Sequence, residues 1–227
     1  MPKIPLILLP GIVCDEENWQ YQIAHLQDLA ECIIPSLSKA DTPQAMVDTV
    51  LAVAPHQFAL AGHSMGGWVA IEVAKRIPDR ISKLCLIDTT AEGDTPEKKA
   101  ARLEMLSRAE QGDIDKIICE LLKLFTFNTK TQEQVRRMFA RNANAFVHQQ
   151  KAIIARESSI ADLAKITCPT LVINARLDQV YPLEYSERIV AGLPDAKLAV
   201  IENSGHMVTI EMPEAVTALM RYWLMYF

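Results

Sequence analysis

The segment at positions 62–67, which reads Gly-His-Ser-Met-Gly-Gly, constrains this chain more than any other stretch. It directly follows the apolar run at 58–61, Phe-Ala-Leu-Ala. A Gly-x-Ser-x-Gly sequence at the end of a strand is typical of a nucleophile elbow, a turn into a helix that is too tight for flanking side chains. Such a turn strains the backbone of Ser64, exposes its hydroxyl and places helix N-terminal amides beside it. The sequence therefore predicts hydrolytic or acyl-transfer chemistry.

The size and charge of the chain exclude several classes of protein. A length of 227 residues fits one domain with room for an insertion and for a sizeable core. The net charge is −5 and the chain has no polybasic run, so we expect no nucleic-acid partner. No segment approaches the roughly 20 consecutive apolar residues that a membrane span needs. We therefore expect no membrane partner either.

The cysteines and the N-terminal segment indicate the cellular compartment in which the protein is expected. Five scattered cysteines without a Cys-x-x-Cys motif indicate reduced thiols, which are typical of the cytoplasm. The apolar segment at 4–14 ends in Cys14 and could be mistaken for a lipoprotein signal. Only Lys3 supplies charge before it, and Ile12 and Val13 are not small residues, so we interpret the segment as the first strand. The predicted location is cytoplasmic.

Short apolar runs alternate with helical patterns along most of the chain. This alternation predicts an α/β fold with a mostly parallel six-stranded sheet and helices on both faces. The predicted strands are Ile4–Leu9, Glu31–Ile34, Gln57–Ala61, Lys83–Ile87, Thr170–Asn174 and Lys197–Glu202. The predicted helices of this core are Asn18–Leu29, Thr42–Ala54, Met65–Ile77, Leu183–Gly192 and Pro213–Trp223.

The alternation breaks between Asp88 and Cys168, where amphipathic helices replace strands. We predict a helical cap, or lid, at 91–164 inserted into a core formed by 1–90 and 165–227. The first of its helices is expected to start at Pro96 after the cap residue Thr95, the third to start with a capping box at Thr131-Gln132-Glu133-Gln134, and the fourth to run from about Asn144 to Arg156. The second is expected to place six apolar residues on one face: Ile114, Ile117, Ile118, Leu121, Leu122 and Phe125.

The charge of the cap differs from that of the core. Residues 97–156 contain 12 basic and 7 acidic residues, hence +5, whereas the remaining 11 basic and 21 acidic residues give −10. Solvated helix faces would explain this difference. The alternative is a basic roof that favours a substrate with a carboxylate or phosphate.

A serine hydroxyl becomes a good nucleophile only when a base takes its proton. His206 is the strongest candidate of five histidines, because it follows the last predicted strand and parallel sheets place their sites at such ends. The third member of a triad should orient the imidazole. Asp178, after the strand at 170–174, is favoured for this role, and Asp88, after the strand at 83–87, is the alternative.

The anionic intermediate of acyl transfer needs two hydrogen-bond donors. One is the amide of Met65, which follows the nucleophile. The other should come from the loop after the first strand, where Pro10 has no amide hydrogen, Gly11 lets the chain turn, and Ile12 is the expected donor.

Three further residues are candidates for the pocket: Gly11, Trp19 and Trp68, although core packing explains the tryptophans equally well. The sequence has no cluster of His, Cys and Asp at metal-ligand spacing, no phosphate loop and no dinucleotide fingerprint. We therefore expect neither a metal nor a cofactor.

These motifs resemble the α/β-hydrolase superfamily, in its branch of small serine hydrolases with a helical cap. The resemblance covers nearly the whole chain and depends on Leu9-Pro10-Gly11, on the segment at 62–67, on Asp178 with Val180 and Pro182, and on Gly205-His206 with Glu211-x-Pro213-Glu214. It implies a Ser64–Asp178–His206 triad with Ile12 and Met65 as oxyanion donors.

The chain also departs from the family pattern. Pro10-Gly11 stands where many members carry His-Gly, and the loop at 35–39 lacks the usual Asp and Gly-His-Gly run. The two leading antiparallel strands of larger members are expected to be missing.

The sequence thus predicts an esterase-like enzyme that cleaves a small carboxylic ester or thioester through an acyl-enzyme on Ser64. Acyl transfer, carbon–carbon bond hydrolysis and perhydrolysis would use the same three residues. A non-catalytic ligand receptor and a scaffold protein are alternatives from other classes. Epoxide hydrolases and haloalkane dehalogenases are disfavoured, because they need an aspartate at the position of Ser64.

Overall fold

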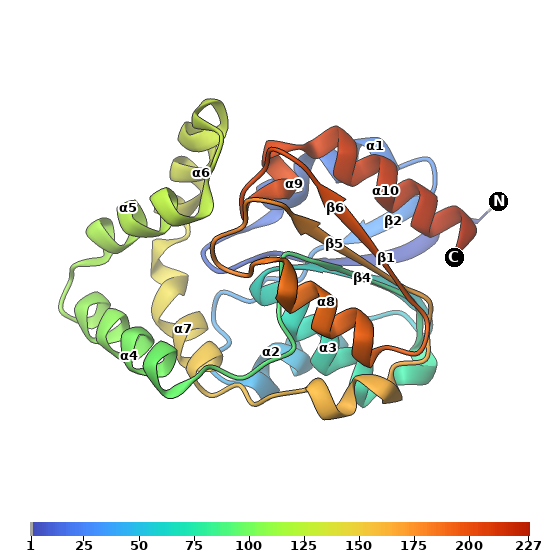
Figure 1. Cartoon of the computed structure of the whole chain (residues 1–227), viewed down its shortest axis with the longest axis horizontal. Coiled ribbons are helices and arrows are strands. Elements are labelled where there is room, and N and C mark those ends of the chain that lie inside the picture. Colours follow the sequence, from blue (N-terminus) through green and yellow to red (C-terminus); the bar gives the residue numbers. More distant parts are fainter. Residues whose placement is uncertain (1) are drawn as a thin grey trace.

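A parallel sheet of six strands forms the centre of the computed structural model, which describes residues 2–227 (Figure 1). The strand order is β2-β1-β3-β4-β5-β6, and every neighbouring pair is parallel. The strands are β1 (Ile4–Leu9), β2 (Ala30–Ile33), β3 (Phe58–His63), β4 (Ile81–Ile87), β5 (Thr170–Ala175) and β6 (Ala196–Ile201). The predicted fold class is confirmed, and the sheet is wholly rather than mostly parallel.

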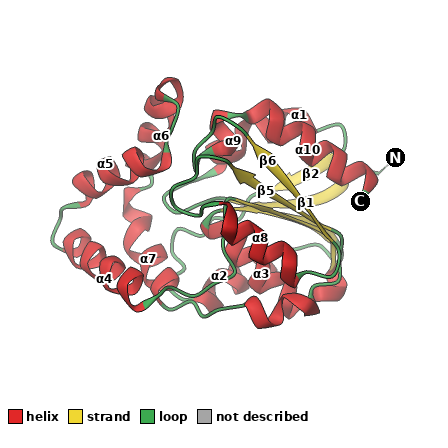
Figure 2. Ribbon diagram, viewed as in Figure 1, coloured by secondary structure: helices red, strands yellow, loops and turns green. Residues whose placement is uncertain are grey.

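Helices cover both faces of this sheet, as Figure 2 shows. One face carries α2 (Pro43–Leu51), α3 (Met65–Arg76) and α8 (Leu183–Gly192), and the other carries α1 (Gln20–Leu26) and α10 (Pro213–Tyr226). The central strands are apolar on both sides because both faces are covered, and β3 is buried along its whole length. The short elements are α9 (Val208–Glu211), η1 (Glu16–Trp19), η2 (Pro78–Arg80), η3 (Ala143–Ala145) and η4 (Ile160–Lys165).

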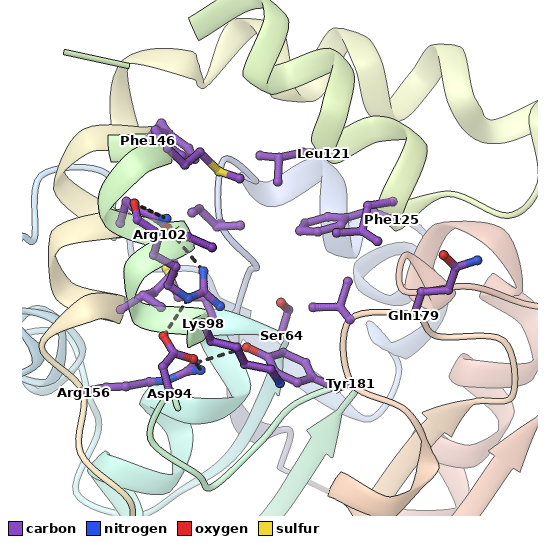
Figure 3. Close-up of a pocket in the computed structure, with 18 residues that line it drawn as sticks. Ser64, Asp94, Lys98, Arg102, Leu121, Phe125, Phe146, Arg156, Gln179 and Tyr181 are labelled. Atoms are coloured by element: carbon purple, nitrogen blue, oxygen red, sulfur yellow. Dashed lines mark hydrogen bonds and ion pairs between the residues drawn. The ribbon is translucent and has the colours of Figure 1, made fainter. Parts of the chain in front are cut away.

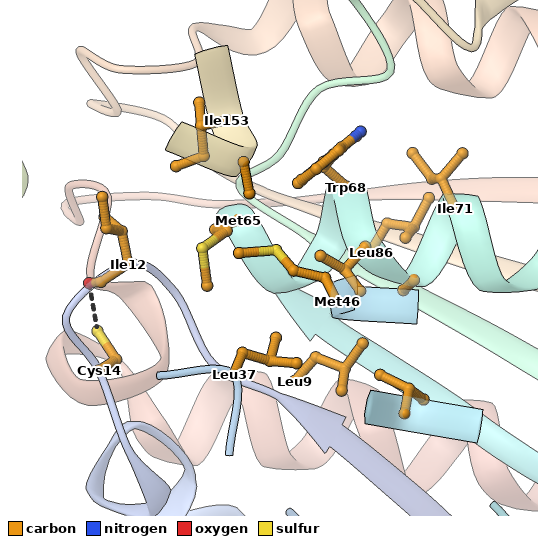
Figure 4. Packing of buried hydrophobic residues seen from close by; sticks show 14 of the residues in the cluster. Leu9, Ile12, Cys14, Leu37, Met46, Met65, Trp68, Ile71, Leu86 and Ile153 are labelled. Carbon is orange, nitrogen blue, oxygen red and sulfur yellow. Dashed lines mark hydrogen bonds between the residues drawn. The ribbon is translucent and has the colours of Figure 1, made fainter. Parts of the chain in front are cut away.

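Two apolar cores follow from this layering. The first contains Trp68 and Met65 of α3, which pack with Leu9 of β1 and Leu86 of β4 (Figure 4). The second, on the opposite face, contains Trp19 and Trp223 among others. The three tryptophan side chains are almost completely buried and fill these cores.

Four helices connect β4 to β5 and lie beyond the carboxyl ends of the strands (Figure 1). They are α4 (Pro96–Glu110), α5 (Ile114–Phe125), α6 (Thr129–Arg141) and α7 (Phe146–Ile154). The apolar face of α5 is buried as its sequence pattern predicts, whereas no residue of α4 is buried. The boundaries of a cap at 91–164 stay a prediction.

The predicted start of α6 was wrong. The helix begins at Thr129, and the side chain of Asn128 caps it by accepting a hydrogen bond from the Lys130 amide at 3.0 Å. Thr131 lies within the first turn, where its hydroxyl donates to the Asn128 carbonyl. Both segments offer a capping side chain, and the Asn128 cap adds most of a turn of helix.

The first turn of α3 lies unusually close to the sheet. A Cβ atom at Gly66 would lie 2.2 Å from the carbonyl oxygen of Leu9, and one at Gly62 would lie 2.2 Å from the carbonyl oxygen of Gly66. Both obstacles are backbone atoms, which no side-chain rotation can remove. Glycine is therefore required at both positions by the close approach of helix and strands.

Two general expectations can be compared with the structure. No described helix is both long enough and apolar enough to cross a membrane. Cys14, Cys32, Cys85, Cys119 and Cys168 are all free thiols, in agreement with the scattered spacing of the cysteines. The cytoplasmic location stays a prediction.

Substituting Gly66→Ala should destabilise the fold by about 2–3 kcal/mol or more, because the added methyl group can be accommodated only if α3 moves away from β1. The control is Gly93→Ala, where the nearest atom to an added Cβ is 3.3 Å away. Urea unfolding of both variants measures the difference. Equal midpoints would show that the contact between α3 and β1 is not the constraint described.

Candidate active site

Ser64 lies between β3 and α3 with backbone angles φ 54° and ψ −117°. This conformation is rare for a residue with a side chain and stores strain of about 1–3 kcal/mol. The surrounding chain holds it in place: the Ser64 amide donates to the Ile87 carbonyl at 2.9 Å, and the Thr89 hydroxyl donates to the Ser64 carbonyl at 2.7 Å. The turn thus positions the Ser64 hydroxyl beyond the carboxyl edge of the sheet.

The loop after β6 carries His206, whose side chain is completely buried. Its Nε2 atom lies 2.7 Å from the Ser64 Oγ atom, and its Nδ1 atom lies 2.8 Å from Asp178 Oδ2. A carboxylate only accepts hydrogen bonds, so the Nδ1–H group donates to Asp178 and Nε2 is free to accept from the hydroxyl. The structure therefore brings the three predicted residues together in one continuous chain of hydrogen bonds.

Asp178 lies in the loop after β5 and is held by the backbone of that loop. Its Oδ1 atom accepts from the amides of Val180 at 2.7 Å and Tyr181 at 3.1 Å, while Oδ2 faces His206. Three N–H donors satisfy a buried carboxylate well. Asp178 is therefore fixed in orientation before any substrate arrives.

Asp88, the alternative acid, lies nearby but makes no hydrogen bond to His206. Its Oδ1 atom accepts from the Ala175 amide at 2.7 Å and from the Asn174 side chain at 3.3 Å, and its Oδ2 atom has no partner among residues 2–227. Burial, with the negative charge of Asp178 as a second cause, raises the pKa of Asp88 well above its usual value. A neutral carboxyl at Asp88 fits this environment.

The expected oxyanion donors lie on both sides of Ser64. The amide of Met65 begins α3, and Ile12 belongs to the loop after β1; both residues line the same cavity as Ser64. Within the described chain, neither amide takes part in the turn hydrogen bonds around the site. Both N–H groups thus remain available to a ligand oxygen.

The loop after β1 has a support that the sequence did not predict. Val13 has a positive φ of 51°, and its amide donates at 2.8 Å to the side-chain carbonyl of Gln149 in α7. This buried contact stabilises the loop after β1. Nothing in the local sequence around Gln149 indicates it, because the two partners are 136 positions apart.

Glu211 is a second residue that the sequence did not assign a role, although it belongs to the quoted Glu211-x-Pro213-Glu214 motif. One of its carboxylate oxygens accepts from the Gly205 amide at 2.7 Å. The other accepts from the amides of Phe127 and Asn128, between α5 and α6, at 2.6 and 2.8 Å. Glu211 therefore ties the His206 loop to the inserted helices.

His63 is buried, directly precedes Ser64 in the sequence and contacts the backbone of His206. Its Nε2 atom lies 2.7 Å from the carbonyl oxygen of His206, and its Nδ1 atom lies 3.0 Å from the side-chain carbonyl oxygen of Asn18, so the single N–H group of a neutral ring donates to one of these two oxygens. Burial, reinforced by the neighbouring His206, lowers the pKa of His63 to about 3. The ring is therefore neutral near pH 7.

Side-chain atoms of His63, Asp88 and His206 lie within 4.8 Å of one another, a spacing that invites comparison with a metal site. Both ring nitrogens of each histidine already have protein partners. A metal ion would have to break the hydrogen bonds to Ser64 or Asp178. The donor set therefore fits a hydrogen-bonded network better than a metal centre.

A cavity of about 260 Å³ opens above Ser64, as Figure 3 shows. Gly11 does not line it but lies next to Ser64, since a Cβ atom there would be 3.4 Å from the Ser64 Cβ atom. Trp19 and Trp68 do not line the cavity either, so core packing, the alternative explanation, describes both tryptophans. Their side chains are directed into the two cores, where burying large aromatic surface is most favourable.

Replacing His63 should reduce the decrease in the free energy of unfolding between pH 7 and 5. Folded His63 stays neutral down to about pH 3, whereas the unfolded residue binds a proton near pH 6.5. Acidification from pH 7 to 5 therefore favours unfolding at this residue by about 2 kcal/mol. Urea unfolding should show that His63→Gln lacks this contribution, while the exposed control His148→Gln retains it. Equal pH dependence in both variants would contradict the prediction.

Comparison with known proteins agrees with this geometry. The model of the alpha/beta hydrolase family matches residues 6–219. A pimeloyl-[acyl-carrier protein] methyl ester esterase from Neisseria meningitidis serogroup B is 30% identical, over 78% of this chain and 72% of the esterase. The structure of a thermophilic esterase from Thermogutta terrifontis superposes with a TM-score of 0.86 at 28% identity, over 97% of this chain and 89% of that chain. This chain therefore belongs to the alpha/beta hydrolase family.

Proposed function

We propose that the protein is a serine hydrolase that cleaves a small carboxylic ester or thioester through an acyl-enzyme on Ser64. The observation that carries this proposal is the unbroken hydrogen-bond chain from Ser64 through His206 to Asp178, with distances of 2.7 and 2.8 Å. The esterase relatives support the choice of an ester substrate.

The reaction begins when His206 Nε2 takes the proton of Ser64 and the serine oxygen attacks the substrate carbonyl carbon. The carbonyl oxygen becomes an oxyanion that accepts hydrogen bonds from the Ile12 and Met65 amides. Asp178 holds the imidazole in the required tautomer and stabilises its positive charge. His206 then gives the proton to the leaving alcohol or thiol, and the acyl group remains on Ser64.

Water completes the cycle. His206 takes a proton from the water molecule, whose oxygen attacks the acyl-enzyme and forms a second oxyanion in the same place. Collapse of this intermediate releases the carboxylic acid and returns the proton to Ser64. If another nucleophile replaces water, the same steps give acyl transfer. The enzyme therefore acts as a hydrolase when water attacks the acyl-enzyme.

Ser64→Ala should abolish turnover of a panel of p-nitrophenyl esters, with kcat falling by at least about 10⁴-fold, because no acyl-enzyme can form. A fluorophosphonate probe should label the native protein on Ser64, as peptide mass spectrometry would show. Tight ligand binding without turnover would instead identify a receptor, and an unlabelled Ser64 in the folded native protein would contradict the proposal.

The substitutions Asp178→Asn and Asp88→Asn should have very different effects on kcat. The first should lower kcat by about 10³–10⁴-fold, because an amide at position 178 favours the wrong tautomer of His206. The second replaces a carboxyl group that burial already favours in its neutral form, so kcat should fall by no more than about tenfold. Steady-state kinetics on one ester measure both. Equal losses would mean that Asp88 shares the role of Asp178.

A further inference from the structure

The cavity above Ser64 has one apolar side and one charged side. The apolar side is formed by residues of the inserted helices, among them Leu121, Phe125 and Phe146 (Figure 3). The charged side contains Lys98 and Arg102 of α4, together with Asp94 before α4 and Arg156 after α7, and Ser64 lines the same cavity (Figure 3). A substrate at the nucleophile would therefore contact both kinds of surface.

The charges on this side do not balance. Asp94 is the only carboxylate among the lining residues, against three cations, so the lining has a formal charge of +3 − 1 = +2. Asp94 is shared: Oδ1 accepts from Arg156 at 2.6 Å, and Oδ2 accepts from Arg102 at 2.7 Å. Lys98, which is exposed, contacts the hydroxyl of Tyr185 rather than a carboxylate. The lining thus keeps a net positive charge, because two arginines share one carboxylate and Lys98 contacts none.

Arg156 is the most deeply buried cation on the charged side of the cavity. Only 2% of its side chain is exposed, and its Nε atom has no hydrogen-bond partner within the described part of the chain. Its other contact is to the buried hydroxyl of Tyr181 at 3.1 Å. Burial tends to raise the pKa of Tyr181, but the positive charges of Arg156 and Arg102 outweigh it and leave that pKa lowered. Arg156 therefore shares its one carboxylate with Arg102, and a substrate anion in the cavity would balance the remaining positive charge.

We propose that Arg156, Arg102 and Lys98 form a carboxylate-binding subsite, and that the substrate is an ester or thioester carrying a second, free carboxylate group. This inference rests on the proposed function for its reaction and adds the class of substrate. The planar guanidinium groups suit a carboxylate because they donate paired hydrogen bonds to it. The apolar side of the cavity receives the methylene carbons between the two carboxyl groups.

Two esters of equal length test this subsite. Methyl hydrogen adipate and methyl hexanoate differ only in that a carboxylate replaces the terminal methyl group. Release of methanol should give a kcat/KM at least about tenfold higher for the adipate half-ester, which corresponds to about 1.4 kcal/mol of transition-state stabilisation. Half-esters from malonate to suberate then locate the preferred spacing. Equal or better hydrolysis of methyl hexanoate would overturn the subsite and leave the proposed function intact.

Variants identify the residues that carry the preference. Arg156→Met should reduce the ratio of the two kcat/KM values towards one, mainly through a higher KM for the half-ester, and Arg156→Lys should restore part of it. Lys99→Met is the matched control, because it removes a neighbouring positive charge that does not line the cavity. A ratio that falls equally in Lys99→Met would point to the general charge of the helices instead.

Binding separates this inference from the proposed reaction. Isothermal titration of methyl hydrogen adipate into Ser64→Ala requires no turnover. Its affinity should fall at least about tenfold when Arg156→Met is added, even if the native protein hydrolyses neither ester. Absence of binding, or equal binding by both proteins, would overturn the subsite whatever the native protein catalyses.

Discussion

The whole site depends on the contact between the start of α3 and the ends of β1 and β3. Gly62 and Gly66 allow backbone to approach backbone at distances that any side chain would block. Because α3 begins this close to β1, the chain passes from strand to helix through the strained conformation of Ser64. The position of the Ser64 hydroxyl therefore depends on the close packing between α3 and the sheet.

The parallel sheet explains how the remaining groups reach this hydroxyl. Every strand ends at the same edge, so loops that are distant in the sequence meet there. The two buried aspartates at this edge have opposite environments. Asp178 accepts three hydrogen bonds from N–H groups, while Asp88 keeps one oxygen without a partner in the described structure. The environment, rather than the residue type, decides which of them orients His206.

Much of this arrangement follows from sequence patterns of short range. The strand at 4–9 and the helix at 183–192 agree with the structure to the residue, and the apolar face expected from Ile114 to Phe125 lies on α5. The Gly-x-Ser-x-Gly segment and the chain order of acid and base predict which residues meet. The boundary of β3 was less accurate, because the strand continues to His63 until the strained serine ends it.

Contacts between distant side chains could not be predicted. A buried tryptophan has the same local pattern whether it faces a core or a cavity, and Trp19 and Trp68 both face a core. Gln149 supports Val13, and Asn18 supports His63, through single side-chain atoms whose partners are set only by the packed fold. The shared pairing of Asp94 with two arginines likewise depends on how α4 and α7 lie together.

The position of Glu211 has a consequence for engineering. Its carboxylate fastens the backbone between α5 and α6 to the loop of His206, and the Met207 amide adds a bond to the Phe125 carbonyl. A shortened protein without the inserted helices would leave one oxygen of a buried carboxylate without its donors. Replacement helices grafted onto this scaffold must therefore supply two amides to the same Glu211 oxygen. Without them, the loop that positions His206 would lose this support.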